Sequence, residues 1–348
     1  MALDTDLEGD EPTPAGIDAA GLERWLVAHV DGLVPPFVYE RVAGGRSNLT
    51  FSVRDAAGRR VVLRRPPLHS TLPSAHDMAR EHRIQAALAD TAVPVPRMLG
   101  HCADEAVTGA EFYVMEHVDG LVVRDRASAD PLAEPARHAT GLNLVDTLVA
   151  LHGVDPDAVG LGDLARRERY IERQLKRWHA QWEAQKTRDL PAMDEAHAAL
   201  AAQVPEQGPA RIVHGDFRLD NAILSPHGDV RAVLDWELCT LGDPLADVGM
   251  LLVYWAEPDD HVVPLGDAAT LEPGFASRAE LVDRYRAARQ VEADLDFYVA
   301  FAYWRIAAIL EGVYARTLAG AYGEVDAAVE RYGRVVADLA EEARRLIA

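Results

Sequence analysis

The first third of the chain alternates short apolar runs with polar positions. Such alternation predicts β-strands, because successive side chains of a strand point to opposite faces of a sheet. The predicted strands are Tyr39–Val42, Leu49–Val53, Arg60–Leu63 and Glu111–His117, and the segment 94–100 is an extended lead into a further strand. Apolar residues at three- and four-residue spacing predict helices at Asp18–Val30 and at Ser74–Ala89, with Ser74 as the cap of the second.

Beyond about Ala139 the apolar residues recur every three or four positions, which predicts helices. These are Gly141–His152, Leu164–Trp182, Pro191–Gln203, Val248–Trp255, Ala279–Arg289, Asp296–Leu318 and Glu324–Ala348. A hairpin of two short strands, Ala222–Leu224 and Val230–Leu234, interrupts the helical pattern. We therefore expect an α+β chain with a tail and helix at 1–36, a sheet-containing lobe at 37–117 and a mostly helical lobe at 118–348.

The composition is that of an ordinary soluble protein, with 348 residues of which 49% are hydrophobic and 26% charged. The net charge of −21 argues against nucleic acid and against an anionic membrane surface as partners. No apolar run approaches the ~20 residues that span a bilayer, and the acidic N-terminus does not resemble a signal peptide. Cys102 and Cys239 form neither a disulfide framework nor a zinc pattern. These features predict a cytoplasmic protein.

The polar segment 214–221 follows a short apolar strand and precedes the hairpin. It carries His214, Asp216 and Asn221 in the pattern His-x-Asp-x-x-x-x-Asn, which is the spacing of the catalytic loop of kinases. Asp235 follows at the end of the hairpin, where kinases have a metal-binding Asp. Carboxylates are hard ligands of the kind that Mg²⁺ prefers. A solvated acidic turn is the alternative, but three matched positions in this context favour the kinase pattern.

Two further segments carry candidate nucleotide ligands. The first lies between the first two predicted strands and contains Gly44, Gly45, Ser47 and Asn48. Successive backbone N–H groups in such a segment can hold a phosphate, although an ordinary glycine hairpin is equally consistent with the residues. The second is the end of the strand Glu111–His117, where Glu116 and His117 would offer backbone groups to adenine in a kinase architecture. A plain strand end is the alternative. Neither G-x-x-x-x-G-K-[ST] nor G-x-G-x-x-G occurs in the chain.

Arg64 directly follows the third predicted strand, where kinases carry a lysine that contacts nucleotide phosphates. The chain has only two lysines, Lys176 and Lys186, so Arg64 or Arg65 must take this role, and we favour Arg64 because it follows the strand directly. A guanidinium group keeps its charge and binds phosphate or carboxylate through two hydrogen bonds. We expect Arg64 to pair with Glu81 in the following helix, and a solvated glutamate is the alternative.

A group of basic residues, the basic stripe, shares one face of the predicted helix Leu164–Trp182 by three- and four-residue spacing. It consists of Arg166, Arg169, Arg173, Lys176 and Arg177. The stripe contrasts with the net charge of −21. It indicates either attraction of an anionic substrate or a solvated face balanced by nearby glutamates.

Several motifs together resemble the aminoglycoside phosphotransferase (APH) and choline-kinase-like superfamily of small-molecule kinases. They are His-Gly-Asp-Phe-Arg-Leu-Asp-Asn at 214–221 and Leu-Asp-Trp-Glu-Leu-Cys-Thr-Leu-Gly-Asp-Pro-Leu-Ala-Asp at 234–247. Gly-Arg-Ser-Asn at 45–48 and Val-Leu-Arg-Arg-Pro-Pro at 62–67 are similar to the kinase-like domains associated with acyl-CoA dehydrogenases. The resemblance implies a bilobal protein-kinase-like fold, with an antiparallel-sheet N-lobe and a mostly helical C-lobe. It also implies ATP and Mg²⁺ as cofactors and a hydroxyl group as acceptor.

The resemblance assigns roles to individual residues. Asp216 is implied to be the catalytic base that orients the acceptor hydroxyl, and Asn221 and Asp235 are implied to be the Mg²⁺ ligands. Arg218 occupies the position of the cation that kinases place near the transferred phosphate. Gly44, Gly45, Ser47, Asn48, Arg64, Glu81, Glu116 and His117 are the expected nucleotide-binding residues.

Other residues of the motifs are expected to be structural. His214 is expected to brace the loop, and Asp243 and Asp247 to cap and hold the helix that follows. The chain lacks the APE segment and the long activation loop of protein kinases, so a regulated protein kinase is not expected.

The leading hypothesis is an ATP-dependent O-phosphotransferase that acts on a small metabolite. The resemblance and the basic stripe favour a hydroxyacyl-CoA or a similar anionic acceptor, with a link to acyl-CoA metabolism. One alternative is a kinase of aminoglycosides or related cationic antibiotics, which the net acidity would suit. Another is a catalytically inactive nucleotide-binding pseudokinase, motivated by the missing lysine. The intact set of Asp216, Asn221 and Asp235 argues against the last.

Overall fold

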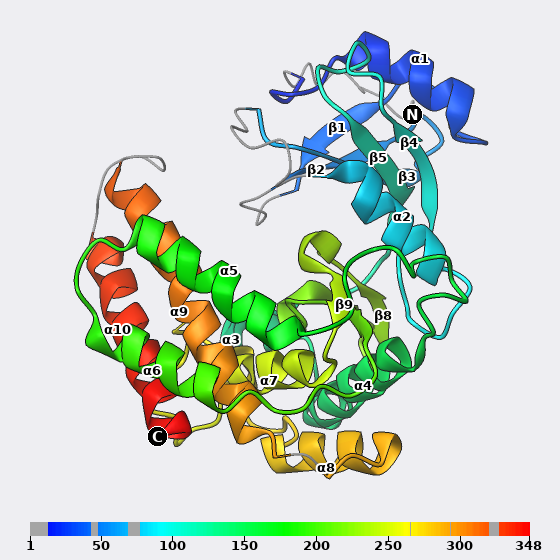
Figure 1. The fold of residues 1–348 in the computed structure, drawn as a ribbon. Coiled ribbons are helices and arrows are strands. Elements are labelled where there is room, and N and C mark those ends of the chain that lie inside the picture. Colours follow the sequence, from blue (N-terminus) through cyan, green and yellow to red (C-terminus); the bar gives the residue numbers. More distant parts are fainter. Residues whose placement is uncertain (1–12, 43–47, 69–76, 265, 293, 320–326) are drawn as a thin grey trace. The chain divides into compact units, whose positions relative to one another are not determined.

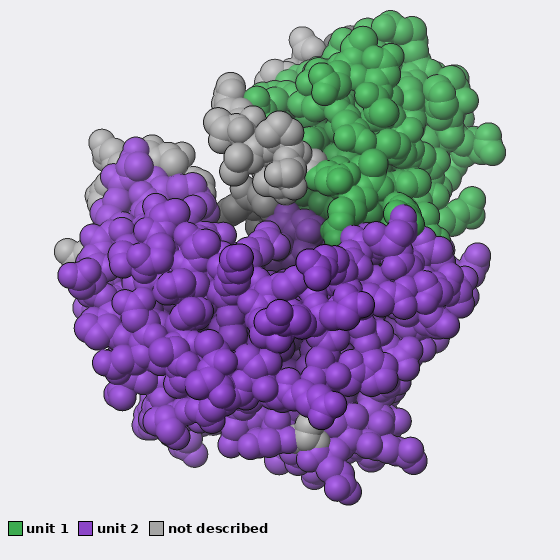
Figure 2. Space-filling model, viewed as in Figure 1, with its two compact units in different colours: residues 1–86, 96–117 green, residues 87–95, 118–348 purple. Residues whose placement is uncertain are grey.

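The computed structural model describes residues 13–42, 48–68, 77–264, 266–292, 294–319 and 327–348. The chain divides into two compact units, which Figure 2 colours separately. The first unit is Met1–Ala86 with Pro96–His117, and the second is Ala87–Val95 with Val118–Ala348. The functional division of the chain into domains stays a prediction, because compactness alone does not say what either unit binds.

The described part of the first unit contains a five-stranded antiparallel sheet in the order β1-β2-β3-β5-β4 (Figure 1). Its strands are β1 (Val38–Arg41), β2 (Leu49–Arg54), β3 (Arg60–Arg65), β4 (Met98–Cys102) and β5 (Phe112–Glu116). The four strands predicted with bounds agree with β1, β2, β3 and β5 to within two residues at each end, and β4 begins inside the predicted lead 94–100. The antiparallel-sheet lobe expected from the sequence is therefore confirmed.

Successive residues of β5 pack on opposite faces of this sheet, as the alternation of a strand requires. Phe112 and Val114 join a core cluster with Trp25 of α1 (Ala19–His29). Tyr113 and Met115 pack instead with Met78 of α2 (Met78–Leu88). One helix thus covers each face of the sheet.

The start of α2 differs from the prediction. Ser74, the predicted cap, lies outside the described residues, and the described helix begins at Met78. Asp77 caps it, because its Oδ1 accepts a hydrogen bond from the N–H of Arg80 at 2.8 Å. The cap fixes the register of the helix and the position of Glu81 one residue beyond Arg80.

The described part of the second unit is mostly helical, as expected. Its helices are α3 (Arg126–Ala129), α4 (Glu134–Gly153), α5 (Tyr170–Gln185), α6 (Pro191–Ala202), α7 (Leu245–Tyr254), α8 (Arg278–Arg289), α9 (Asp296–Leu318) and α10 (Ala327–Ile347). Helix α9 has the predicted bounds and packs against α5, α6, α7 and α10 (Figure 1). None of the described helices is long and apolar enough to cross a membrane.

Two small antiparallel sheets connect the helices of this unit. Strand β6 (Arg211–Val213) pairs with β9 (Thr240–Gly242), and β7 (Ala222–Leu224) pairs with β8 (Val230–Val233). The hairpin β7–β8 agrees with the prediction. Strand β9 was not predicted, because three residues are too few to show an alternation of apolar and polar positions. Pairing of β6 with β9 brings the start of the polar segment 214–221 close to the start of α7.

The predicted helix Leu164–Trp182 is wrong at its start, because α5 begins at Tyr170. Arg169 adopts a left-handed conformation with φ of 53°, which a continuing helix does not allow. The side chain of Gln207 holds this irregular turn. Its Oε1 accepts from the N–H of Tyr170 at 2.8 Å, and its Nε2 donates to the carbonyl oxygen of Arg167 at 2.8 Å. The basic stripe is therefore not one helical face, since two of its members precede the helix.

Candidate active site

Asp216 lies at the centre of a hydrogen-bonded loop between β6 and β7. Its Oδ2 accepts from Nε of Arg218 at 3.1 Å and from Nδ2 of Asn221 at 2.9 Å. The same Nδ2 donates to the backbone oxygen of Asp216 at 2.8 Å. Asp216 is half-buried. Within the described residues both side-chain donors use Oδ2, so Oδ1 remains for another partner. The pattern His-x-Asp-x-x-x-x-Asn thus folds into one compact constellation.

The backbone of this loop is held by two helices. The carboxylate of Asp247 in α7 accepts from the N–H of His214 at 2.7 Å and from the N–H of Gly215 at 2.8 Å. Arg305 in α9 donates from Nη2 to the carbonyl oxygen of Gly215 at 2.5 Å. Asp247 therefore anchors the loop, which corrects the expectation that it caps the following helix. The reason is the β6–β9 pairing, which brings the loop to the first turn of α7.

The backbone conformation of this loop requires glycine at position 215. Its φ of +86° lies in the left-handed region, and a Cβ atom here would lie 2.7 Å from the carbonyl oxygen of Leu238. His214 braces the loop, as expected. Its Nδ1 accepts from the N–H of Asp216 at 3.2 Å, which leaves the ring proton on Nε2, 3.0 Å from the carbonyl oxygen of Leu234.

Asp243 has the structural role that was expected for it. Its Oδ1 accepts from the N–H of Leu245 at 3.0 Å, at the first residue of α7. Its Oδ2 accepts from the hydroxyl of Tyr298 in α9 at 2.8 Å. The motif residue thus fixes the start of α7 against the central helix of the unit.

Asp247 also contacts a buried histidine. Its Oδ2 lies 3.4 Å from Nε2 of His152 in α4. Burial lowers the pKa of His152 and outweighs the carboxylate beside it. Burial alone would raise the pKa of Asp247, but the hydrogen bond from His152, with the loop amide of Gly215, holds that pKa below its usual range. The pair is a neutral imidazole beside a carboxylate whose charge faces the loop.

The hairpin β7–β8 joins Asn221 to Asp235. The N–H of Leu234 donates to the carbonyl oxygen of Asn221 at 2.8 Å, and Asp235 is the next residue. Asp235 has φ of 66°, a conformation that is rare outside glycine and that recurs at functional sites. Because Nδ2 of Asn221 is bonded to Asp216, its amide oxygen is the end left for a ligand. An amide oxygen and a carboxylate on one hairpin fit the oxygen chemistry of Mg²⁺.

Arg218 is enclosed by acidic and aromatic groups. In addition to Asp216, its Nη1 lies 2.8 Å from Oδ2 of Asp220, and its guanidinium carbon lies 4.9 Å from the ring centre of Tyr254. Burial lowers the pKa of Arg218, but the charges of Asp216 and Asp220 outweigh it and keep the pKa above its ordinary value. A charged guanidinium is therefore fixed beside Asp216, and its role toward a transferred phosphate stays a prediction.

Sequence reasoning missed Arg305. It is 3% exposed, and its guanidinium carbon lies 5.2 Å from the ring centre of Trp178 in α5. Within the described residues its Nε has no hydrogen-bond partner. The signal in the sequence is one charged residue inside the apolar run Tyr-Trp-Arg-Ile. Because arginine is almost never buried without a partner, that position could have been singled out.

In the first unit, Glu81 joins the side chains of three other residues. Its Oε1 accepts from Nδ2 of Asn48 at 3.0 Å, its Oε2 accepts from the hydroxyl of Tyr113 at 3.0 Å, and Oε2 lies 3.2 Å from Nε of Arg64. Glu81 is 2% exposed. Burial raises the pKa of Tyr113, which keeps the phenol protonated as a donor. The predicted contact of Arg64 with Glu81 is confirmed, and their role toward a nucleotide stays a prediction.

The remaining nucleotide-site predictions are not tested by the structure. Three of the residues lie outside the described part of the chain: Gly44, Gly45 and Ser47. Asn48 is buried, and its Oδ1 has no hydrogen-bond partner within the described residues. Glu116 ends β5, and its N–H donates to the carbonyl oxygen of Arg97 at 2.8 Å, so that amide is already used in the sheet edge. His117 follows it and is half-buried.

The fold and this loop define a kinase-like phosphotransferase. Residues 38–298 match the model of the phosphotransferase enzyme family, APH. The chain belongs to this family, which confirms the resemblance seen in its motifs.

Curated relatives of the chain carry names from acyl-CoA metabolism. Mouse acyl-CoA dehydrogenase family member 10 is 38% identical over 305 residues, which cover 85% of this chain and 28% of that protein. Human acyl-CoA dehydrogenase family member 11 is 34% identical over 344 residues, which cover 94% of this chain and 43% of that protein. The chain therefore spans less than half the length of these relatives.

Solved structures share the fold over nearly the whole chain. A crystal structure from Ralstonia eutropha, provisionally assigned as an aminoglycoside phosphotransferase, has a TM-score of 0.80 and 34% identity, covering 95% of this chain and 98% of its own. A ternary complex of aminoglycoside phosphotransferase APH(4)-Ia with AMP-PNP and hygromycin B has a TM-score of 0.60 and 18% identity, covering 94% and 98%. The second likeness shows the fold alone.

Proposed function

We propose that the protein is an ATP- and Mg²⁺-dependent O-phosphotransferase that phosphorylates a hydroxyl group of a small molecule. The observation that carries this proposal is the constellation of Asp216, in which Arg218 and Asn221 both donate to Oδ2. A carboxylate fixed in this way has one oxygen left to accept a proton. Membership of the phosphotransferase family supports the same reaction class.

The proposed roles follow from the contacts in the loop. Asp216 receives the proton of the acceptor hydroxyl as that oxygen attacks the γ-phosphorus. Arg218 remains charged beside it and stabilises the negative charge that develops on the transferred group. Asn221 and Asp235 would hold Mg²⁺, which when bound neutralises charge on the phosphates. His214, Asp247 and Arg305 keep the loop in position and do not touch the reacting atoms.

In the first unit we assign the nucleotide phosphates to Arg64. Its partner Glu81 accepts hydrogen bonds from Asn48 and Tyr113, so a fixed carboxylate lies 3.2 Å from the guanidinium Nε before any ligand arrives. A planar guanidinium offers a second edge to a phosphate while one edge faces a carboxylate. This arrangement supports arginine as the replacement for the usual lysine.

For the acceptor we propose an anionic metabolite such as a hydroxyacyl-CoA. The names of the curated relatives support a link to acyl-CoA metabolism. Arg173, a member of the basic stripe, donates from Nη2 to the carbonyl oxygen of Arg166 at 2.6 Å. Its buried Nη1 has no hydrogen-bond partner within the described residues. This buried cationic atom, in the first turn of α5, is the group that we assign to the attraction of an anionic acceptor.

An aminoglycoside or related cationic antibiotic is the second candidate acceptor. The family includes proteins whose structures hold hygromycin B, and the chain has a net charge of −21. Cationic acceptors would be attracted by that charge and repelled by Arg173. The sign of the charge on the accepted substrate thus separates the two candidates.

A screen for ADP production tests the proposal. ATP and Mg²⁺ would be supplied with hydroxyacyl-CoAs, aminoglycosides and amino alcohols in turn. We expect turnover with a hydroxyacyl-CoA, and we expect Asp216→Asn to remove it. ADP release that is the same in Asp216→Asn would instead identify a pseudokinase with contaminating activity.

A charge reversal tests the acceptor. Arg173→Glu should raise the KM for a hydroxyacyl-CoA and leave the KM for ATP unchanged. Arg169→Glu is the matched control, because the exposed Arg169 already pairs with Glu172 at 3.0 Å. Phosphorylation of kanamycin without activity on thioesters would establish the antibiotic candidate.

A further inference from the structure

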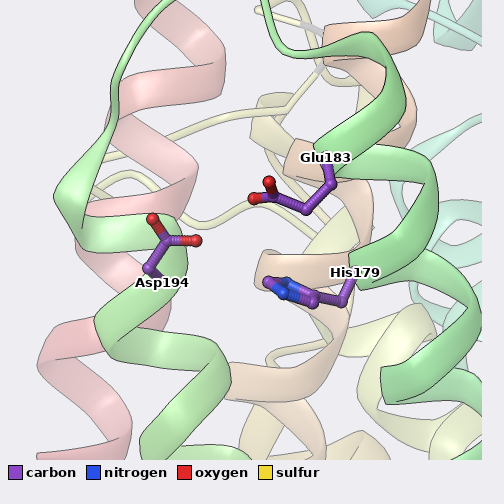
Figure 3. A group of neighbouring side chains, drawn as sticks. All are labelled: His179, Glu183 and Asp194. Carbon is purple, nitrogen blue, oxygen red and sulfur yellow. The ribbon is translucent and has the colours of Figure 1, made fainter.

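Three potential metal ligands meet on the neighbouring helices α5 and α6, away from the loop of Asp216 in the sequence. His179 and Glu183 are four residues apart on α5, and Asp194 lies in the first turn of α6. One ligand atom of each lies within 4.8 Å of the other two. Figure 3 shows the three side chains pointing toward one another across the space between the helices. An ion placed there would have one imidazole and two carboxylates as ligands.

The orientation of His179 is fixed by stacking. The ring of His197, from α6, lies parallel to it with ring centres 4.0 Å apart and an interplanar angle of 7°. His197 in turn stacks on Trp304 of α9 with centres 5.4 Å apart. Two parallel imidazoles cannot both direct an in-plane lone pair at one ion. His197 is therefore a positioning residue, and His179 is the nitrogen ligand.

The environment of His179 is suited to an added ligand. Its Nδ1 is buried and has no hydrogen-bond partner within the described residues. An imidazole nitrogen without a partner is unfavourable, and an ion bound at that nitrogen would remove the deficit. A cavity of about 350 Å³ lined by His179 and His197 opens beside the stack.

One cation already competes for this site. Nζ of Lys186 lies 2.9 Å from Oε1 of Glu183. An incoming ion must share that carboxylate with Lys186 or displace the ammonium group of Lys186. Removal of the ammonium group should therefore strengthen metal binding, a result that a merely structural role for Glu183 does not produce.

We propose that His179, Glu183 and Asp194 form a second metal site, separate from the proposed Mg²⁺ site, that takes a divalent transition ion such as Zn²⁺. One imidazole with two carboxylates suits Zn²⁺ and Co²⁺ better than Mg²⁺, which prefers oxygen ligands alone. Three protein ligands leave the fourth tetrahedral position to water. The bound ion would pin α5 to α6.

Competition against a chromogenic chelator measures the affinity for Zn²⁺ of the whole chain, prepared without a histidine tag. Magnesium in millimolar excess keeps the site of Asn221 and Asp235 occupied by its own ion. We expect one Zn²⁺ per chain and a rise in Tm on binding. His179→Ala and Asp194→Asn should each weaken binding by at least about 100-fold, and His197→Ala by roughly 10-fold, as for a residue that orients a ligand.

Matched variants keep the test specific. Glu195→Gln changes the carboxylate next to Asp194, and His138→Ala removes an exposed histidine of α4, so both should bind Zn²⁺ as the wild type does. Lys186→Met should bind more tightly. Co²⁺ should give the intense visible bands of a tetrahedral site in the wild type and lose them in His179→Ala. Equal Zn²⁺ affinity in the wild type and His179→Ala, or less than one ion per wild-type chain, would overturn the proposal.

Discussion

The carboxylate of Glu81 lies 3.2 Å from the guanidinium Nε of Arg64, and the two side chains are 2% and 14% exposed. A pair this buried cannot lose one member without leaving the other charge uncompensated. We expect Arg64→Met to destabilise the first unit by about 3 kcal/mol. Arg64→Lys should retain most of the stability because it keeps the charge, but its KM for ATP should rise, because an ammonium group lacks the two-pronged contact to phosphate.

Urea denaturation and initial-rate kinetics on the two variants check this prediction. Arg60→Met, at an exposed position of the same strand, is the control. If Arg64→Met bound ATP as well as the wild type does, the assignment of the phosphates to this guanidinium would fail.

Gly215 and Gly58 give a matched pair of glycines with nearly equal φ, +86° and +84°. A Cβ atom at Gly215 would lie 2.7 Å from the carbonyl oxygen of Leu238, whereas at Gly58 nothing lies within 4 Å. Gly58→Ala should therefore cost only the conformational strain, about 1 kcal/mol. Gly215→Ala adds the steric conflict and should displace Asp216, with a loss of kcat of about 100-fold or more.

The comparison is made on Tm and kcat for both variants. A fall of kcat in Gly215→Ala that is no larger than in Gly58→Ala would show that the loop tolerates displacement.

Substitution of Arg305 should lower the rate of the reaction and leave substrate binding unchanged. Its Nη2 donates to the carbonyl oxygen of Gly215, next to Asp216, and we propose that this contact positions the loop. Arg305→Met is expected to lower kcat by about 10- to 100-fold with little change in the KM for ATP. Arg305→Lys, which can still donate, should recover part of the rate. Equal kcat in the two variants would mean that the hydrogen bond does not position the loop.

The pair of His152 and Asp247 predicts acid sensitivity of the second unit. Burial lowers the pKa of His152 from 6.5 in the folded state, so the unfolded chain takes up a proton that the folded chain does not. Stability therefore falls as the pH decreases below about 6.5. The pKa of Asp247 is also lowered, so a second loss is expected as the pH falls below 3.8, its value in the unfolded chain.

Urea midpoints measured across this range test the assignment. His152→Asn should remove the first loss, and substitution of the exposed His227 should leave it unchanged. An unchanged slope near neutral pH in His152→Asn would show that another group is responsible.

Local sequence patterns predicted the structure correctly where contacts between residues close in the chain determine it. The ends of α9 were predicted to the residue, and His214, Asp216 and Asn221, chosen for their spacing, lie in one hydrogen-bonded loop. The start of α5 was missed because Gln207, far along the chain, holds the turn before Tyr170. Arg305 was missed for the same reason, since its partner Gly215 is 90 residues away.

The near absence of lysine has a practical consequence for chemical labelling. Reagents that survey nucleotide sites by acylating a lysine beside the phosphates need an amine there, and this chain has Arg64 instead. Its two amine side chains, Lys176 and Lys186, both extend from the helical unit, on α5 or directly after it. Such surveys would leave the proposed nucleotide site unmarked even with the enzyme fully active. Its activity in a cell extract would have to be sought by arginine-directed reagents or by its product.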